Sequence, residues 1–416
     1  MTTVVRGYKT ELDLKNEQRT ACMKHAGCAR FAYNWGLARC QEVYRTTGKR
    51  PSAIDLHKEL NALKPTDFPW MYEVSKAAPQ EALRDLEQAY KNFFRKVKLK
   101  AQGKHKGTCG FPKFKSRNQA IGSFRLTGSM HVYADSVQLP RLGLLRLHEH
   151  HYIPTDAKVR SVTVSEQAGR WYVSVQVEEE QKEPVPTATS AIGVDLGIKT
   201  LATLSDGTIF ENPRALKHAQ KKLRRLEKQK SRRQKGSKNR QKTRQALAKL
   251  HARIANMRKD MAHKLTSYLV KNHALVAIED LYVNGMLKNH KLAQAVSDSN
   301  FGEIRRQLEY KAAWHGTHVA VIDRFYPSSK TCSGCGYVKP ELALSERTFS
   351  CHECGMVLDR DVNAAINIVN VAVSSTDTLN AHGVGSSGLS EKRSETCHVE
   401  VGTKGDIWDT SQMSMF

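Results

Sequence analysis

Four cysteines in two closely spaced pairs constrain this sequence more than any other feature. Cys332 and Cys335 form one C-x2-C pair, Cys351 and Cys354 form another, and residues 336–350 separate the pairs. A glycine follows each pair, where a metal knuckle needs a tight turn. Four thiolates at this spacing are typical of a zinc ribbon. We therefore predict one structural Zn²⁺ held by these four cysteines, with no part in catalysis.

The charge of the chain indicates a polyanionic partner. Lys and Arg number 66 against 41 Asp and Glu, a net charge of +25, and such an excess attracts nucleic acid. A membrane surface would require bulky apolar residues on an amphipathic helix, and the most basic stretch, residues 217–259, has few of them. No apolar run reaches the ~20 residues of a membrane span, and the first residues lack a signal sequence. We expect an intracellular protein without a membrane partner.

The hydrophobic pattern of the first 190 residues predicts a strand, two helices and then a group of short strands. Alternating residues on both sides of Ala168-Gly169 predict a hairpin. Short strands of this kind favour a small antiparallel barrel, and a proline-containing linker then marks a domain boundary. The expected elements are a strand at 4–13, helices at 16–46 and 80–100, strands within 120–182, and the linker at 181–190.

The pattern after residue 190 predicts a mixed α/β domain. Residues 217–259 carry many Lys and Arg and a single acid, Glu227, yet leucines recur at helical spacing. This favours two basic helices joined around Gly236 and packed through a leucine seam. The other expected elements are strands at 191–197, 201–204, 274–279 and 319–322, a helix at 301–315, and a Ser/Gly-rich disordered tail at 376–416.

Three acidic residues lie at strand or helix ends in this second part: Asp195, Glu279 and Asp361. Carboxylates from separate elements can hold two Mg²⁺ ions that act on one phosphate. The RNase H fold supplies such a set from two strands and a helix. For each residue an alternative stays open at this point. Asp195 could be a turn residue at the end of a strand, Asp280 could replace Glu279, and Asp361 could be a helix cap while Asp359 serves the site.

Several motifs resemble the OrfB/TnpB proteins of insertion sequences. The resemblance covers about residues 1–385. It rests on the four cysteines and on motifs at 92–94 (NFF), 110–115 (GFPKFK), 193–199 (GVDLGIK), 278–281 (IEDL), 307–312 (QLEYKA) and 359–368 (DRDVNAAINI).

This resemblance implies a RuvC-type nuclease, related to type V CRISPR effectors, that uses a guide RNA from its own element. It would cleave double-stranded target DNA beside a short adjacent motif, as a monomer with one RNA from the transposon end. Asp195, Glu279 and Asp361 match the catalytic triad of the family. Asp195 would bridge two Mg²⁺ ions, and the other two carboxylates would complete one ion site each. The expected location is the cytoplasm of a prokaryote, acting at the nucleoid.

The fold class that follows is a multidomain α+β protein. It would combine an RNase H-like (RuvC) nuclease and its inserted zinc ribbon with a split, wedge-like β-barrel and a helical recognition lobe. The expected boundaries are 1–15 and 118–185 for the barrel, 16–117 for the recognition lobe, 191–327 and 356–375 for the nuclease, and 328–355 for the ribbon.

Nucleic-acid contacts are expected from basic residues and from one helix start. Lys76 and Gln80 lie one helical turn apart and could face a base edge of the adjacent motif together, although an ordinary exposed helix start explains them equally well. The basic stretch would hold a heteroduplex through its backbone. The expected phosphate contacts are Lys221, Lys222, Arg224, Arg225, Arg232, Arg233, Arg305 and Arg306.

Two other activities fit part of the same pattern. A transposase that joins DNA ends also uses three carboxylates on this fold. A nuclease-inactive relative could act as an RNA-guided DNA-binding repressor. Such a protein would lack one of the triad acids, whereas this sequence contains all three.

Overall fold

The computed structural model describes residues 2–105, 107–117, 122–181, 184, 188–343 and 345–381. The chain divides into two compact units at Gln181/Lys182, within the linker expected from the sequence. Residues 118–121, at the expected start of the second barrel segment, and 382–416 of the expected tail lie outside the described residues. Within the described part, the structure contains no helix with the length and apolar character that crossing a membrane requires.

The first unit contains a seven-stranded antiparallel sheet in the order β2-β6-β7-β1-β5-β4-β3. The N-terminal strand lies inside this sheet because it pairs with β7 along most of its length and with β5 at its end. The expected hairpin is confirmed: Ala168 and Gly169 both have positive φ, as a two-residue hairpin turn requires. The strands are β1 (Thr2–Asp13), β2 (Ser123–Leu126), β3 (His131–Val132), β4 (Ser136–Leu139), β5 (Gly143–Leu147), β6 (Lys158–Gln167) and β7 (Arg170–Gln181).

The helices of the first unit pack on one another and share a core with the sheet. The close approach of α1 and α3 depends on Gly36, where a Cβ would lie 2.6 Å from Leu83 Cδ2. His25 of α1 accepts a hydrogen bond from the Ser75 backbone N–H at 3.0 Å, which fixes the chain just before α3. The helices are α1 (Asn16–Thr47), α2 (Ala53–Leu63), the 3-10 helix η1 (Pro69–Glu73) and α3 (Ala77–Ala101).

The second unit contains a mixed five-stranded sheet in the order β10-β9-β8-β11-β12. The first three strands along the chain form an antiparallel meander, and β11 then pairs in parallel with both β8 and β12. The strands are β8 (Ala191–Leu196), β9 (Thr200–Leu204), β10 (Ile209–Glu211), β11 (Leu275–Glu279) and β12 (His318–Ile322).

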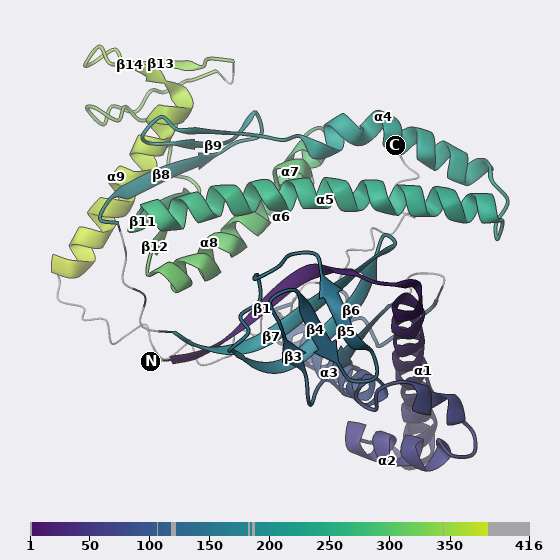
Figure 1. Ribbon diagram of the computed structural model, residues 1–416. Helices are drawn as coiled ribbons and strands as arrows, with labels where there is room; N and C mark the ends of the chain where they lie inside the picture. The colour runs from purple at the N-terminus through teal and green to yellow at the C-terminus, as the bar shows by residue number, and fades with distance from the viewer. Residues whose placement is uncertain are drawn as a thin grey trace. The chain divides into compact units, whose positions relative to one another are not determined.

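Helices cover both faces of this sheet (Figure 1). Val194 and Ile278 point into a core shared with α5 (Lys238–Asn272) and α8 (Phe301–His315). Ala277 points the other way, against Ile368 of α9 (Arg360–Ala381). Successive strand residues alternate between faces, so Asp195 and Glu279 belong to the α9 side. The last turns of α9 include residues 376–381, which the sequence had placed in the disordered tail; that boundary is therefore wrong.

The backbone of α9 approaches β8 most closely at Gly193. A Cβ at this position would overlap the Ala365 carbonyl oxygen and lie 3.0 Å from the Val369 backbone nitrogen. Gly193 also exchanges hydrogen bonds with Ser205, donating its N–H to Ser205 Oγ at 3.1 Å and accepting from the Ser205 N–H at 3.0 Å. Glycine is required here because helix and strand approach backbone to backbone.

The expected basic helices are α4 (Ala215–Arg232) and the first half of α5. They are joined by a turn in which Gly236 has a φ of 89°. The predicted leucine seam is confirmed, and its buried members are Leu223, Leu226, Leu247, Leu250 and Ile254. We call residues 215–254 the basic hairpin.

We predict that Gly193→Ala lowers the free energy of unfolding of the second unit by about 2 kcal/mol or more, because the new methyl group displaces α9. Chemical denaturation of the purified protein measures this change. The control is Gly302→Ala on α8, where a Cβ meets nothing within 4 Å, so no loss is expected. Equal effects of the two substitutions would contradict the close-approach explanation.

Candidate functional site

The strand register and α9 bring the three predicted carboxylates toward one edge of the mixed sheet. Val194 pairs with Ile278 in parallel, so Asp195 and Glu279 each follow directly after a paired residue. Asp361 lies in the first turn of α9, one helical turn before Ala365, which rests on Gly193.

Glu279, and not Asp280, remains available at the end of β11. Asp280 is held by two arginines, Arg305 at 2.6 Å on one carboxylate oxygen and Arg324 on the other. These hydrogen bonds lower the pKa of Asp280 below its usual range. Glu279 instead accepts one hydrogen bond from Ser328 Oγ. Of the two acids that the sequence left open at this position, the contacts in the structure therefore favour Glu279.

The helix cap of α9 is Asp359, and not Asp361. The Asp359 Oδ1 accepts hydrogen bonds from the backbone N–H groups of Asp361 at 2.9 Å and Val362 at 3.2 Å. These are the unpaired donors that a capping carboxylate satisfies. The Asp361 carboxylate takes no part in the cap; it accepts hydrogen bonds from the Arg360 guanidinium at 3.4 Å.

The electrostatics of this edge favour a bound cation. Burial raises the pKa of Asp195 to about 7, with further contributions from the charges of Glu279 and Asp361. Carboxylate oxygens are the ligands that Mg²⁺ prefers, and a cation would relieve the repulsion among them. Among the described residues, only the four cysteines place three or more potential ligand atoms all within 4.8 Å of one another. The carboxylates are therefore more widely spaced than that.

The four cysteines form a second candidate metal centre. The Sγ atoms of Cys332 and Cys354 lie 3.6 Å apart, as do those of Cys335 and Cys351. Four sulfurs at ~2.3 Å from one zinc ion would lie about 3.8 Å from each other. Both glycines after the pairs have positive φ, 78° and 72°. The residues thus fit a tetrahedral zinc ion, and the sequence prediction of a zinc site agrees with this cluster.

Two buried asparagines connect the cysteine cluster to α9. Asn363 donates to the Thr331 carbonyl oxygen at 2.7 Å and accepts from the Ser333 N–H at 3.0 Å. Asn367 donates to the carbonyl oxygens of Thr331 at 2.6 Å and Ser328 at 2.8 Å. Because Ser328 also bonds Glu279, one chain of contacts runs from the first cysteine pair to a carboxylate of the site.

These asparagines and Ser328 were not among the residues predicted from the sequence. A usable signal was present, since the two amides are the only polar residues of the sequence at positions 362–369 and lie four residues apart. Their partners are backbone carbonyls, which no sequence pattern identifies.

The predicted phosphate contacts on the basic hairpin differ in their surroundings. Lys221, Lys222, Arg224, Arg225 and Arg232 are exposed on α4. Arg233 is half-buried and donates to the Asn239 carbonyl oxygen at 2.7 Å and to Thr243, so it ties the turn of the hairpin together.

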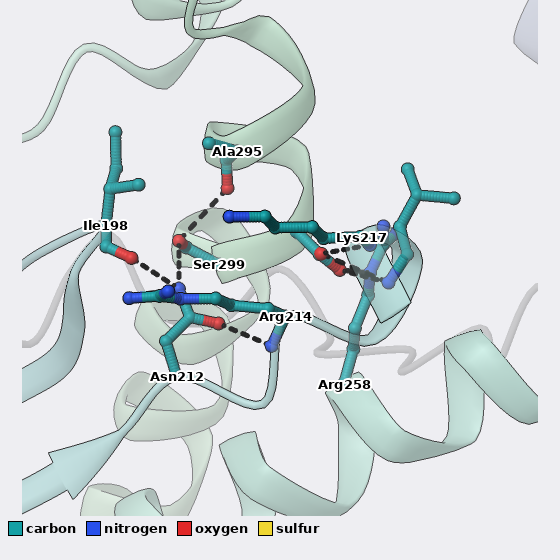
Figure 2. Close-up of polar contacts among 9 residues, drawn as sticks. Ile198, Asn212, Arg214, Lys217, Arg258, Ala295 and Ser299 are labelled. Atoms are coloured by element: carbon teal, nitrogen blue, oxygen red, sulfur yellow. Dashed lines mark hydrogen bonds and ion pairs between the residues drawn. The ribbon is translucent and has the colours of Figure 1, made fainter. Parts of the chain in front are cut away.

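A buried polar network fixes the base of the basic hairpin (Figure 2). Asp298 is 5% exposed. It accepts hydrogen bonds from the N–H groups of Leu216 and Lys217 at the start of α4 and pairs with Arg258 of α5 at 2.9 Å. Next to it, Asn212 donates to Ser299 Oγ at 3.0 Å. The carboxylate offsets the unpaired donors of the helix start, which sets the direction in which α4 leaves the sheet.

The remaining predicted contacts lie elsewhere. Arg305 is engaged by Asp280 and Glu309, and Arg306 forms an ion pair with Glu303 at 2.6 Å. In the first unit, Lys76 is exposed at the start of α3 and Gln80 is half-buried in its first turn.

We predict that Cys332→Ser lowers the zinc content from one ion per chain, because a hydroxyl is a poor replacement for a thiolate ligand. Metal analysis of the purified protein by mass spectrometry measures this. Cys109→Ser is the control, since Cys109 belongs to no cysteine cluster among the described residues. Unchanged zinc in Cys332→Ser would argue against the centre.

We predict a pH-dependent effect of Asp195→Asn on stability in buffer without magnesium. The pKa of Asp195 is raised in the folded protein, so the folded state binds the proton more tightly than the unfolded state. The carboxyl therefore destabilises the fold increasingly from its unfolded pKa up to about 7. Asp195→Asn should raise the melting temperature at about pH 8 and change it little at about pH 4. A difference that is independent of pH would contradict this assignment.

Comparison with known proteins places the chain in a family. The OrfB_IS605 family model, described as "Probable transposase", matches residues 174–290; the Cas12f1-like TNB domain model matches 301–368, and a helix-turn-helix domain model matches 1–49. In this structure the last of these segments contains β1 and α1.

Two similar proteins carry the name "Putative RNA-guided DNA endonuclease". The one from Streptomyces pristinaespiralis is 37% identical over 89% of this chain and 90% of its own length. The other, InsQ of Escherichia coli K12, is 36% identical over 88% and 92%. Among solved structures, a Cas12f1 chain from a complex with sgRNA and target DNA has a TM-score of 0.51 at 13% identity. The alignment covers 88% of this chain and 99% of the Cas12f1 chain. At this low sequence identity, the match shows a likeness of fold alone. The chain belongs to the OrfB/TnpB family.

Proposed function

We propose that this protein is an RNA-guided DNA endonuclease whose active site contains Asp195, Glu279 and Asp361. The names of its relatives support this activity, as do the sgRNA and target DNA bound in the Cas12f1 complex. The assignment of the site depends on one observation: the five neighbouring acids differ in the groups that contact them. Two arginines engage Asp280, and Asp359 caps α9. Glu279 and Asp361 are the two acids whose charges act most strongly on the buried Asp195, and Arg360 pairs with Asp361.

The proposed fold of the second unit is RNase H-like. In its favour, the strand order has an antiparallel meander continued by two parallel strands, with α9 against the face that carries Asp195. By the same proposal, the first unit is the wedge-like barrel with the helical recognition lobe, and the cysteine segment is the zinc ribbon.

In this proposal, Asp195, Glu279 and Asp361 are the residues that would hold two Mg²⁺ ions. When bound, the ions would supply the Lewis acid that activates water and stabilises the leaving oxygen of the phosphodiester. The contribution of the chain itself is positional. Ser328 orients Glu279 through its hydroxyl, and Asp359 fixes the first turn of α9 and with it Asp361.

Nucleic-acid binding is assigned in this proposal to the exposed cations of the basic hairpin. Five of the predicted contacts are exposed on α4, whose direction is set by Asp298, and they suit the backbone of a guide–target heteroduplex. Lys76 and Gln80 remain the proposed readers of the motif beside the target. Arg233, Arg305 and Arg306 are weaker candidates, because protein groups already engage their guanidinium groups.

The test starts from protein that is expressed together with the DNA flanking its gene, and from sequencing of the RNA that co-purifies. A discrete RNA that contains element-derived sequence is expected. When this RNA carries a new guide sequence, the complex should cleave a matching plasmid in Mg²⁺. Random cellular RNA, or strand-transfer products in place of cleaved ends, would instead favour the transposase that the family description names.

We predict that Asp195→Ala abolishes cleavage by this complex, with a loss of at least about 10³-fold, because a metal ligand is removed. RNA and target binding should stay within about threefold, since the basic hairpin is unchanged. Gel assays of cleavage and of binding measure the two effects. Asp260→Ala is the matched control: this exposed acid pairs with Lys264 on α5 and should leave cleavage unchanged. Loss of RNA binding in Asp195→Ala would mark Asp195 as structural.

A further inference from the structure

One large aromatic side chain beside the candidate site lies almost wholly in solvent. Phe325 follows β12 and is 85% exposed, the highest value among the large hydrophobic residues of the described chain. Single exposed apolar residues are common on protein surfaces and need no function. The case for a role therefore depends on where the ring lies and on how its loop is held.

The loop that carries Phe325 is anchored on both sides to the end of β11. Before the ring, Arg324 forms an ion pair with Asp280. After it, Ser328 donates a hydrogen bond to Glu279. Glu279 and Asp280 are consecutive, so the position of Phe325 is tied to one of the proposed metal ligands.

The turn itself is also fixed from within. The Asp323 carboxylate accepts the Phe325 backbone N–H at 2.8 Å, and the Asp323 carbonyl oxygen accepts the Tyr326 N–H at 3.2 Å. Tyr326 packs against the core beneath α9. The neighbouring residue is thus held inward while Phe325 is directed outward. The exposure of the ring therefore comes from a well-bonded turn.

The surroundings of the ring suit a nucleobase. The Arg324 guanidinium lies over the Tyr282 ring at 5.5 Å, so a planar cation adjoins Phe325 in the chain. An aromatic ring offers a face to any base, independent of sequence, and stacking of this kind is the usual grip on single strands. A base inside a duplex has both faces covered by its neighbours, so an unpaired base is the occupant that fits.

We propose that Phe325 stacks on an unpaired base of the DNA strand that enters the carboxylate site. The stacked base would place the adjoining phosphate at Asp195, Glu279 and Asp361. The inference rests on the proposed function, to which it adds a positioning residue and a single-stranded form of the substrate at this point.

The test compares Phe325→Ala, Phe325→Leu and Phe325→Trp with the unchanged protein. The first readout is the fluorescence of single-stranded DNA with one 2-aminopurine, bound to the RNA-loaded protein in Ca²⁺; a stacked 2-aminopurine is quenched. The second is the rate of target cleavage in Mg²⁺. Quenching should be lost in the Ala and Leu variants and retained in Trp. Cleavage should fall about tenfold in Ala and Leu only.

Phe325→Leu is the decisive variant, because it keeps an apolar side chain and removes the ring. If the Phe325→Leu variant quenches the fluorescence and cleaves DNA like the unchanged protein, the proposal that Phe325 stacks on a base is wrong. Equal quenching in all four proteins would also overturn it. If quenching depends on the ring but the unchanged protein cleaves no DNA, the proposed function fails and the stacking site remains. Melting temperatures within about 2 °C would show that the exposed position tolerates each change.

Discussion

The candidate site depends on one backbone contact, the approach of α9 to β8 at Gly193. Because Gly193 has no Cβ, the backbone of α9 can approach the backbone of β8 at Ala365. Asp361 is one helical turn before Ala365, and Asp195 is two residues after Gly193 on the same face of the sheet. The distance between a helix-borne and a strand-borne carboxylate is thus controlled by the one residue type that permits this approach.

The second constraint is the satisfaction of buried polar groups. Asn363 and Asn367 are almost fully buried, and their amides bind backbone carbonyls of the segment that leads into the first cysteine pair. An unsatisfied amide in such a place costs about 1–3 kcal/mol. The cysteine segment and α9 therefore stabilise each other, and a metal bound by the four cysteines would contribute to the order of the carboxylate site although it lies outside that site.

Charge is handled differently in the two functional regions. At the sheet edge, burial raises the pKa of Asp195, and the charges of Glu279 and Asp361 add to this rise, while the nearby Arg360 opposes it. On the basic hairpin, cations are exposed along α4 while a buried acid, Asp298, holds its first turn and Arg258. The Asp298–Arg258 ion pair thus lies at the base of the hairpin, and five of the predicted contacts on α4 are exposed.

The sequence by itself determined the larger helices and strands and the kinds of side chain at the candidate sites, namely thiolates, carboxylates and basic groups. Periodicity located the basic helices and four of the five strands of the mixed sheet, and cysteine spacing predicted the four-cysteine cluster, because these signals are local. It did not decide between Glu279 and Asp280, or between Asp361 and Asp359. The tertiary structure favoured one of each pair, because Arg305, Arg324 and the start of α9 engage the others. It also revealed Ser328 and the two asparagines. Their partners lie 30 or more residues away, and such contacts exist only once the chain is folded.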